Sequence, residues 1–162
     1  MKIEIESRES IKNRAKEPFP AHTALISVTD SDHNFVVLDN KPEYLLQMKF
    51  DDVSDEIFED LLGRKPTETE TVTLTENFKM FNDEQAAEIA EFIKSVSGRA
   101  TLLICQCEYG QSRSAGIAAA VKQFLYGDGV EIFADARYYP NKLVYRKVLA
   151  ALKNRGEICK NE

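Results

Sequence analysis

The stretch LLICQCEYGQSRSAGIAAAV, residues 102–121, decides how the rest of the chain is interpreted. It begins as an apolar run and ends as a run of small residues, and a cysteine, a glycine, an arginine and two serines lie between the two runs. The apolar residues at 101–105 predict a buried strand, and the small residues at 114–126 predict a helix whose backbone lies close to that strand. Cys107 would then follow the strand, and Arg113 and Ser114 would lie in the first turn of the helix.

Other short runs around this stretch predict further strands. Alternating apolar residues, or runs rich in β-branched and aromatic residues, occur at residues 1–7, 21–28 and 44–50. Helical patterns lie between them and after them. Strands that alternate with helices indicate an α/β fold with a largely parallel central sheet flanked by helices.

Two of the predicted helices have recognisable ends. The helix at 82–98 begins with Asn82 and Gln85 at capping-box spacing and ends at Gly98. The helix at 140–153 is expected to carry Pro140 in its first turn. The apolar faces of these two helices, which we expect to be buried, consist of Ala86, Ile89, Ile93 and Val96 in the first and Val144, Val148, Leu149 and Leu152 in the second.

Three other segments are short or less determined. Residues 9–17 predict one or two helical turns that end before a pair of prolines. Residues 55–66 are compatible with a short helix. The polar, threonine-rich residues 67–76 are compatible with a strand or an exposed loop.

Composition and charge restrict the class of protein. The 162 residues fit a single domain over 1–162, and 43% hydrophobic with 30% charged residues is a globular composition. No apolar run is long enough to cross a bilayer and the N-terminus lacks a signal-peptide pattern, so we expect a cytoplasmic protein with no membrane partner. The odd set of Cys105, Cys107 and Cys159 favours a reduced setting. The net charge of −6 disfavours general nucleic-acid binding.

The turn between the central strand and the helix has the chemistry of an anion site. A helix N-terminus presents unpaired amide donors and a partial positive charge. Gly110 can adopt a positive φ that turns successive amides into one concavity, and Arg113 can bind two phosphate oxygens. Cys107 at its base would face groups that lower a thiol pKa, and a thiolate beneath a phosphoryl group is a nucleophile. The expected phosphate-binding residues are Glu108, Tyr109, Gly110, Gln111, Ser112 and Arg113.

The segment CEYGQSRS resembles the C-x5-R-S/T signature of the cysteine-dependent protein tyrosine and dual-specificity phosphatases, including the glycine three residues after the cysteine. The flanking helices and the segment YYPNKLVYRKVLAAL are also similar to that family, so that about two thirds of the chain is covered. The resemblance implies a phosphatase-like fold and hydrolysis of a phosphomonoester through a cysteinyl-phosphate, with no metal or other cofactor. It also implies a phosphorylated substrate, a phosphoprotein first, and a role for Ser114 in releasing the thiolate.

The same family requires an aspartate that acts as general acid. The strand that ends at Phe50 runs into Asp51 and Asp52, and alignment on this strand gives Asp52 the place of the acid. Asp51 is the alternative, and Asp55 and Asp83 are less favoured. By this resemblance, the segment GRKPTETETVTL, residues 63–74, would be an insertion near the entrance of the site, and the role of the wider segment 61–80 stays open.

One departure from the signature leaves a second function open. The family usually has histidine before the cysteine, whereas this sequence has Gln106, which donates a hydrogen bond but carries no charge. The alternative function is therefore a weak or inactive pseudophosphatase that binds phosphate or a phosphoprotein. A redox pair of Cys105 and Cys107 is disfavoured because alternate strand positions lie too far apart for a relaxed disulfide. The same two thiols lack companion ligands for a metal.

Overall fold

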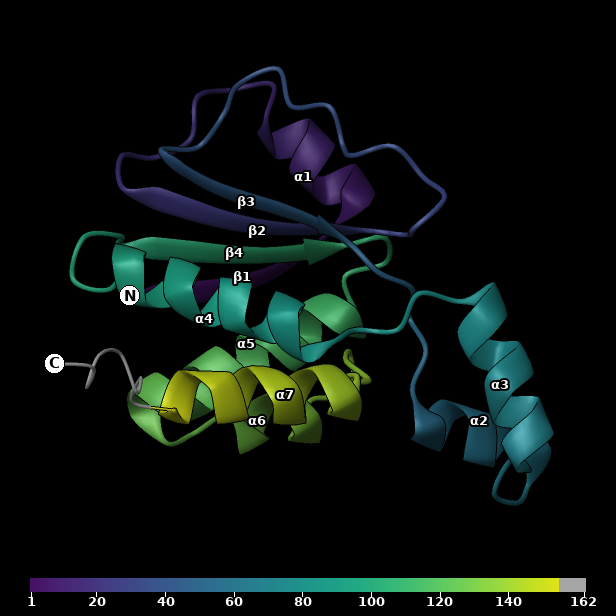
Figure 1. Cartoon of the computed structure of the whole chain (residues 1–162). Coiled ribbons are helices and arrows are strands. Elements are labelled where there is room, and N and C mark those ends of the chain that lie inside the picture. Colours follow the sequence, from purple (N-terminus) through teal and green to yellow (C-terminus); the bar gives the residue numbers. More distant parts are fainter. Residues whose placement is uncertain (155–162) are drawn as a thin grey trace, which may run out of the picture.

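The computed structural model describes residues 1–154, which form a parallel sheet with helices on both faces (Figure 1). Four strands make up the sheet in the spatial order β1-β4-β2-β3. They are β1 (Lys2–Ser7), β2 (Thr23–Thr29), β3 (Tyr44–Lys49) and β4 (Leu102–Cys107). The predicted α/β class with a parallel central sheet is confirmed. Cys159 lies outside the described residues.

The strand β4 is paired on both sides, which places its end in the middle of the sheet edge. Cys105 is in register with Ile5 of β1 and with Ile26 of β2. Because all pairs are parallel, the carboxyl ends of the four strands meet at one edge. The residues that follow Cys107 therefore lie beside those that follow β1 and β2, and the end of β3 lies at the same edge one strand further along.

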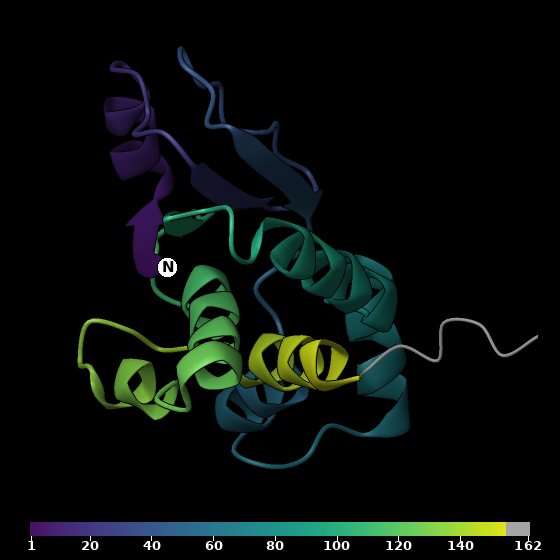
Figure 2. The ribbon, with the colours of Figure 1, turned by 90° about the vertical axis from the view of Figure 1, so that its left-hand side faces the viewer.

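Five helices lie on the two sides of the sheet. On one face lies α1 (Arg8–Arg14), and the view in Figure 2 places the other four on the opposite side. These four are α4 (Asp83–Val96), α5 (Arg113–Tyr126), α6 (Val130–Ala134) and α7 (Lys142–Lys153). The five-residue α6 was not predicted. Within residues 1–154, no helix has the length and apolar character needed to cross a membrane.

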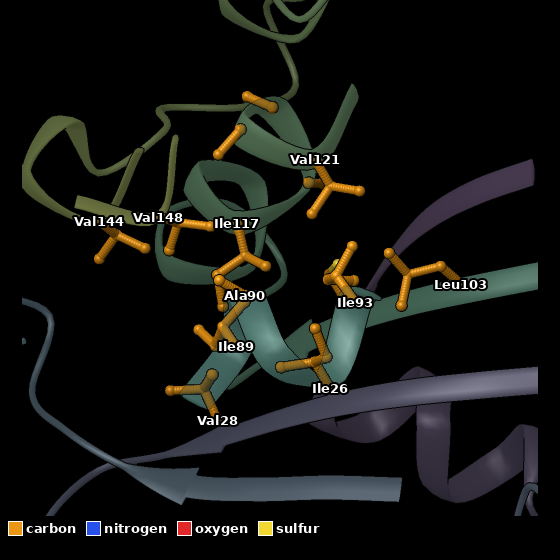
Figure 3. Packing of buried hydrophobic residues seen from close by; sticks show 14 of the residues in the cluster. Ile26, Val28, Ile89, Ala90, Ile93, Leu103, Ile117, Val121, Val144 and Val148 are labelled. Atoms are coloured by element: carbon orange, nitrogen blue, oxygen red, sulfur yellow. The ribbon is translucent and has the colours of Figure 1, made fainter. Parts of the chain in front are cut away.

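The main core lies between the sheet and the helices α4, α5 and α7. Figure 3 shows Ile26 and Leu103 from the sheet facing Ile93 and Ile117 from the helices. The predicted inward residues of α4 are all buried, as are those of α7 except the half-buried Leu149. A smaller cluster under α1 contains Ile11, Leu25, Val36 and Ile104. The two faces of β4 are thus buried in different clusters, as alternation along a strand requires.

The ends of the helices confirm some predictions and correct one. Asn82 and Gln85 form the predicted capping box of α4, and Gly98 after its end has φ +80°. In α7, the prediction that Pro140 occupies the first turn is wrong. The helix begins at Lys142, because the side chain of Asn141 caps it by accepting a hydrogen bond from the amide of Val144 at 3.2 Å.

A pair of short helices follows β3, where the sequence left the structure undetermined. The short helix compatible with residues 55–66 is present as α2 (Asp55–Leu62). The interpretation of residues 67–76 as a strand or loop is wrong, because they belong to α3 (Glu68–Asn77). Thr67 and Glu70 form a capping box, and the Glu70 carboxylate also binds both terminal nitrogens of Arg64 at 2.8 Å. These contacts outweigh the weak helix propensity of threonine.

Candidate active site

The loop between β4 and α5 begins with a buried thiol. Cys107 is 2% exposed, and its Sγ lies 3.0 Å from the Oγ of Ser114, the second residue of α5. The strand fixes one end of the loop in the middle of the sheet and α5 fixes the other. Cys107, Arg113 and Ser114 thus lie around one loop at the carboxyl edge of the sheet.

The carbonyl groups of the loop are bound by other elements, whereas its amides remain free. The amides of Arg8, Tyr139 and Asn141 donate to the carbonyl oxygens of Glu108, Gln111 and Ser112, at 3.0, 2.9 and 3.1 Å. The amides of the loop residues 108–112 donate to no acceptor within residues 1–154, and the amide of the first helical residue has none inside its helix. A row of unpaired donors at a helix N-terminus is suited to an anion.

The conformation at Gly110 depends on the absence of a side chain. Its φ is +68°, which glycine adopts without strain. A Cβ atom at this position would lie 2.7 Å from the backbone carbon of Glu6 and 2.7 Å from the amide nitrogen of Ser7. The loop therefore packs directly against the end of β1.

The guanidinium of Arg113 is held at one end and unpaired at its other edge. The residue is 3% exposed. Its Nη1 donates to the carbonyl oxygen of Phe50 at 2.7 Å and forms an ion pair with Oδ1 of Asp30 at 2.5 Å. Its Nε is buried and has no acceptor among the described residues. An unpaired buried donor of a charged group is costly unless a ligand satisfies it.

The two aspartates after β3 have different surroundings. Asp51 accepts hydrogen bonds from the amide and hydroxyl of Ser31, at 2.9 and 2.8 Å, and from the amide of Lys79 at 2.7 Å. Burial raises the pKa of Asp51, but these hydrogen bonds and the charge of Arg113 together hold the pKa below its usual value. Its oxygens are engaged in tying three segments together.

Asp52 instead faces the loop. Its Oδ1 accepts hydrogen bonds from the hydroxyl of Ser112 at 2.7 Å and from the side-chain amide of Asn141 at 3.0 Å. Its Oδ2 has no hydrogen bond within residues 1–154. Of the two neighbouring aspartates, only Asp52 contacts the loop and keeps an oxygen available for proton transfer.

Gln106 lies on the opposite face of β4 from the two cysteines. It is fully buried, and its Oε1 accepts a hydrogen bond from the hydroxyl of Ser27 at 2.6 Å. Its Nε2 donates to the carbonyl oxygen of Cys107 at 2.7 Å. The amide thus ties β2 to β4 and orients the peptide at which the loop begins, as expected from its hydrogen-bonding capacity.

A cavity of about 440 Å³ opens over this edge of the sheet. Arg113, Asp52, Asp30 and the exposed Tyr109 line it, together with Ser31, Asp32, His33, Asp51, Val53, Asn77 and Phe78. The less favoured acid candidates, Asp55 and Asp83, do not line it. The cavity collects residues from the ends of β2, β3 and β4.

Sequence reasoning missed two residues of this site, Asp30 and Asn141. Asp30 directly follows β2, outside the segments to which the sequence pattern assigned a function. Since the carboxyl ends of parallel strands meet at one edge, its position at a strand end was the available signal. Asn141 was counted only as part of the last helix.

The Cys105 thiol and a cluster of three potential metal ligands have no assigned role in the site. Complete burial raises the pKa of the Cys105 thiol, and Cys105 shares the main core with Cys107. Asp30, His33 and Glu108 place potential metal-ligand atoms within 4.8 Å of one another. Asp30 is already paired with Arg113, whose positive charge disfavours a cation beside it, so these residues have no assigned metal role.

No protein-family model and no curated protein matches the sequence. Among solved structures, Tk-PTP in the active form is 15% identical, with a TM-score of 0.49 over 96% of this chain and 94% of that chain. PTPMT1 in complex with PI(5)P is 12% identical, with a TM-score of 0.47 over 81% and 77% of the two chains. PTPMT1 in a second structure is 10% identical, with a TM-score of 0.44 over 94% and 90%. At these values the argument for function depends on the geometry of the loop.

Proposed function

We propose that the protein is a phosphomonoester hydrolase of the protein tyrosine and dual-specificity phosphatase type. The observation that carries the proposal is the set of unpaired donors beside Cys107. The amides of residues 108–112 and the buried Nε of Arg113 have no acceptor among the described residues, and an oxyanion is a ligand that accepts hydrogen bonds from several such donors at once. A phosphoryl group bound there would lie over the Cys107 sulfur.

In the first proposed step, the Cys107 thiolate attacks phosphorus. The new S–P bond forms as the bond from phosphorus to the leaving oxygen breaks, and Asp52 gives its proton to that oxygen. The amides of Glu108, Tyr109, Gly110, Gln111, Ser112 and Arg113, with the Arg113 side chain, stabilise the equatorial oxygens. Ser112 and Asn141 hold one oxygen of Asp52, and the other oxygen has no hydrogen-bond partner among the described residues and is assigned this task.

In the second proposed step, water attacks the cysteinyl-phosphate. Asp52, now ionised, takes a proton from the water, the S–P bond breaks, and inorganic phosphate is released. Ser114 stabilises the departing thiolate by donating a hydrogen bond from its hydroxyl, which lies 3.0 Å from the sulfur. No step of this scheme uses a metal or a cofactor. A phosphoprotein is the first expected substrate, and the cytoplasm the expected location.

The test is hydrolysis of an aryl phosphate between pH 5 and 9, in chelator and reductant. Cys107→Ser should abolish turnover, and Asp52→Asn should remove the limb of the pH profile that depends on the acid. Asp55→Asn is the matched control, since Asp55 is a nearby exposed aspartate outside the cavity. Turnover that survives Cys107→Ser, or disappears on chelation, would contradict the proposal.

The second candidate function is phosphate recognition without turnover. Gln106 supports it, because a neutral amide next to Cys107 gives no charge stabilisation to a thiolate. The two candidates differ in a simple measurement. Absence of turnover at every pH, together with binding of tungstate that is lost in Arg113→Ala, would establish the recognition module.

A further inference from the structure

The excess of acidic over basic residues lies in one segment of the sequence. We define the acidic arm as residues 51–81, which contain α2 and α3. The arm has nine acidic and three basic residues, a net charge of −6, which equals the net charge of the whole chain. The remaining 18 acidic and 18 basic residues cancel. The arm therefore accounts for the whole net charge of the protein.

The arm projects from the body of the protein beside the carboxyl edge of the sheet (Figure 1). The helix α3 has no buried residue, so neither of its faces is covered by the rest of the described chain. Apolar side chains are exposed on the arm as well, with Leu61 at 76% and Val72 at 54% exposure. In contrast, α2 buries Phe58 and pairs with α7 through Glu56 and Arg146. An exposed helix with both charges and apolar side chains, as in α3, is suited to contact with a polypeptide.

Most carboxylates of the two helices have no cation beside them. Glu56 pairs with Arg146, and Glu70 pairs with Arg64. The others have no ion-pair partner within residues 1–154; they are Asp55, Glu59, Asp60, Glu68 and Glu76. These carboxylates are available to positive charges of a partner.

The arm is joined to the candidate active site at the end of α3. Asn77 and Phe78 line the same cavity as Arg113 and Tyr109. Arg113, whose buried Nε has no acceptor among the described residues, is the cationic residue of this cavity that would bind an oxyanion in the proposed function. A ligand whose phosphate reaches Arg113 therefore leaves the cavity next to the arm. Additional negative charges on that ligand would be repelled, whereas positive charges would be attracted.

We infer that the substrate is a phosphorylated polypeptide with lysine or arginine residues flanking the phosphorylated residue, and that these residues bind the acidic arm. This inference rests on the proposed phosphatase function. It disfavours nucleotides, RNA ends and phosphoinositides, which bring several negative charges close to the phosphoryl group. The arm thus selects the substrate by the charge of the residues that flank the phosphorylated residue. The loop binds the phosphate group, which peptides, nucleotides, RNA ends and phosphoinositides all carry.

The first test compares three phosphotyrosine peptides that differ only in their flanks, which are basic, neutral or acidic. In low salt, kcat/KM should be about tenfold higher for the basic than for the acidic peptide, and 0.5 M salt should remove most of the difference, because exposed charges are screened. Equal values for the three peptides would overturn the inference, as would faster hydrolysis of phosphoinositide in vesicles than of any peptide. An aryl phosphate, which has no flanks, reports the proposed function separately: if it is not hydrolysed, that function fails.

The second test neutralises the arm. A triple variant should lower the ratio of kcat/KM between the basic and the acidic peptide by about three- to tenfold. It combines Glu59→Gln, Asp60→Asn and Glu76→Gln. Hydrolysis of the aryl phosphate should not change, since none of the three residues lines the cavity. The matched control changes three exposed carboxylates of α4 in the same way, Glu84→Gln, Glu88→Gln and Glu91→Gln. An equal effect of the two triple variants would refute a specific role of the arm.

Discussion

Replacing Gly110 by alanine tests whether the phosphate loop depends on its close contact with β1. The substitution has two structural effects. Alanine in the left-handed region, at φ +68°, costs about 1–2 kcal/mol. The new Cβ would also lie 2.7 Å from backbone atoms of Glu6 and Ser7. Backbone atoms cannot move aside as a side chain can by changing rotamer, so the loop or the strand must shift. Overpacking of this kind costs about 1–3 kcal/mol.

A control variant separates the two effects. Gly127, at the other end of α5, has φ +78°, and nothing lies within 4 Å of the position that a Cβ would occupy. Gly127→Ala should therefore show the conformational cost alone, about 1–2 kcal/mol. Gly110→Ala should destabilise the protein by about 2–5 kcal/mol.

Equilibrium unfolding in urea, followed by circular dichroism, gives the two stabilities. Tungstate binding, measured by calorimetry on folded protein, gives the state of the loop. We expect Gly110→Ala to weaken tungstate binding by about tenfold or more, because oxyanion donors act within a narrow range of distance. Gly127→Ala should bind tungstate normally. If the two variants matched in both stability and tungstate affinity, the close contact with β1 would have no role in building the loop.

Three further variants test the surroundings of the loop. Asp30→Asn removes the charge that holds Nη1 of Arg113, so the affinity for tungstate should fall about three- to thirtyfold in calorimetry. The urea midpoint of this variant should stay near the native value. An unchanged affinity for tungstate would exclude a positioning role of Asp30. Gln106→Leu leaves two buried partners unpaired and should lower the free energy of unfolding by about 1–3 kcal/mol, whereas a stability equal to the native value would show that these hydrogen bonds are dispensable. The pKa of Asp51 is lowered in the folded state, so its contribution to stability is present above its unfolded pKa and is lost as the pH falls through the folded value. Asp51→Asn should therefore lower the urea midpoint at pH 7 and much less at pH 3, and an equal effect at both pH values would contradict this assignment.

The sequence predicted those parts of the site that depend on local order along the chain. Cys107, Gly110 and Arg113 lie in one strand, loop and helix, so their spacing was sufficient to place them together. Asp30 is different, because its contact with Arg113 requires β2 to lie beside β4. Strand order is set by packing between distant segments, which spacing does not reveal.

The aspartates and the threonine-rich segment show two other limits. Asp51 and Asp52 are adjacent, and the alignment on the strand favoured Asp52 without revealing the partners of either. These partners are Ser31 and Lys79 for Asp51, and Ser112 and Asn141 for Asp52. In α3, the Thr67 and Glu70 capping signal was present in the sequence, but the strand propensity of threonine outweighed it in the interpretation. The position of the arm beside the cavity depends on tertiary structure, whereas its charge is readable from the sequence.

The carbonyl groups of the loop connect oxyanion binding to both ends of the described chain. They accept hydrogen bonds from Arg8, at the start of α1, and from Tyr139 and Asn141, just before α7. A ligand that binds only the intact loop stabilises every segment whose opening would dismantle it. Amide hydrogen exchange at these three donors should therefore slow when tungstate binds, although Arg8 lies more than a hundred positions from the other two in sequence. Anion binding would thus stabilise the contacts of the loop with the first and the last helix of the described chain.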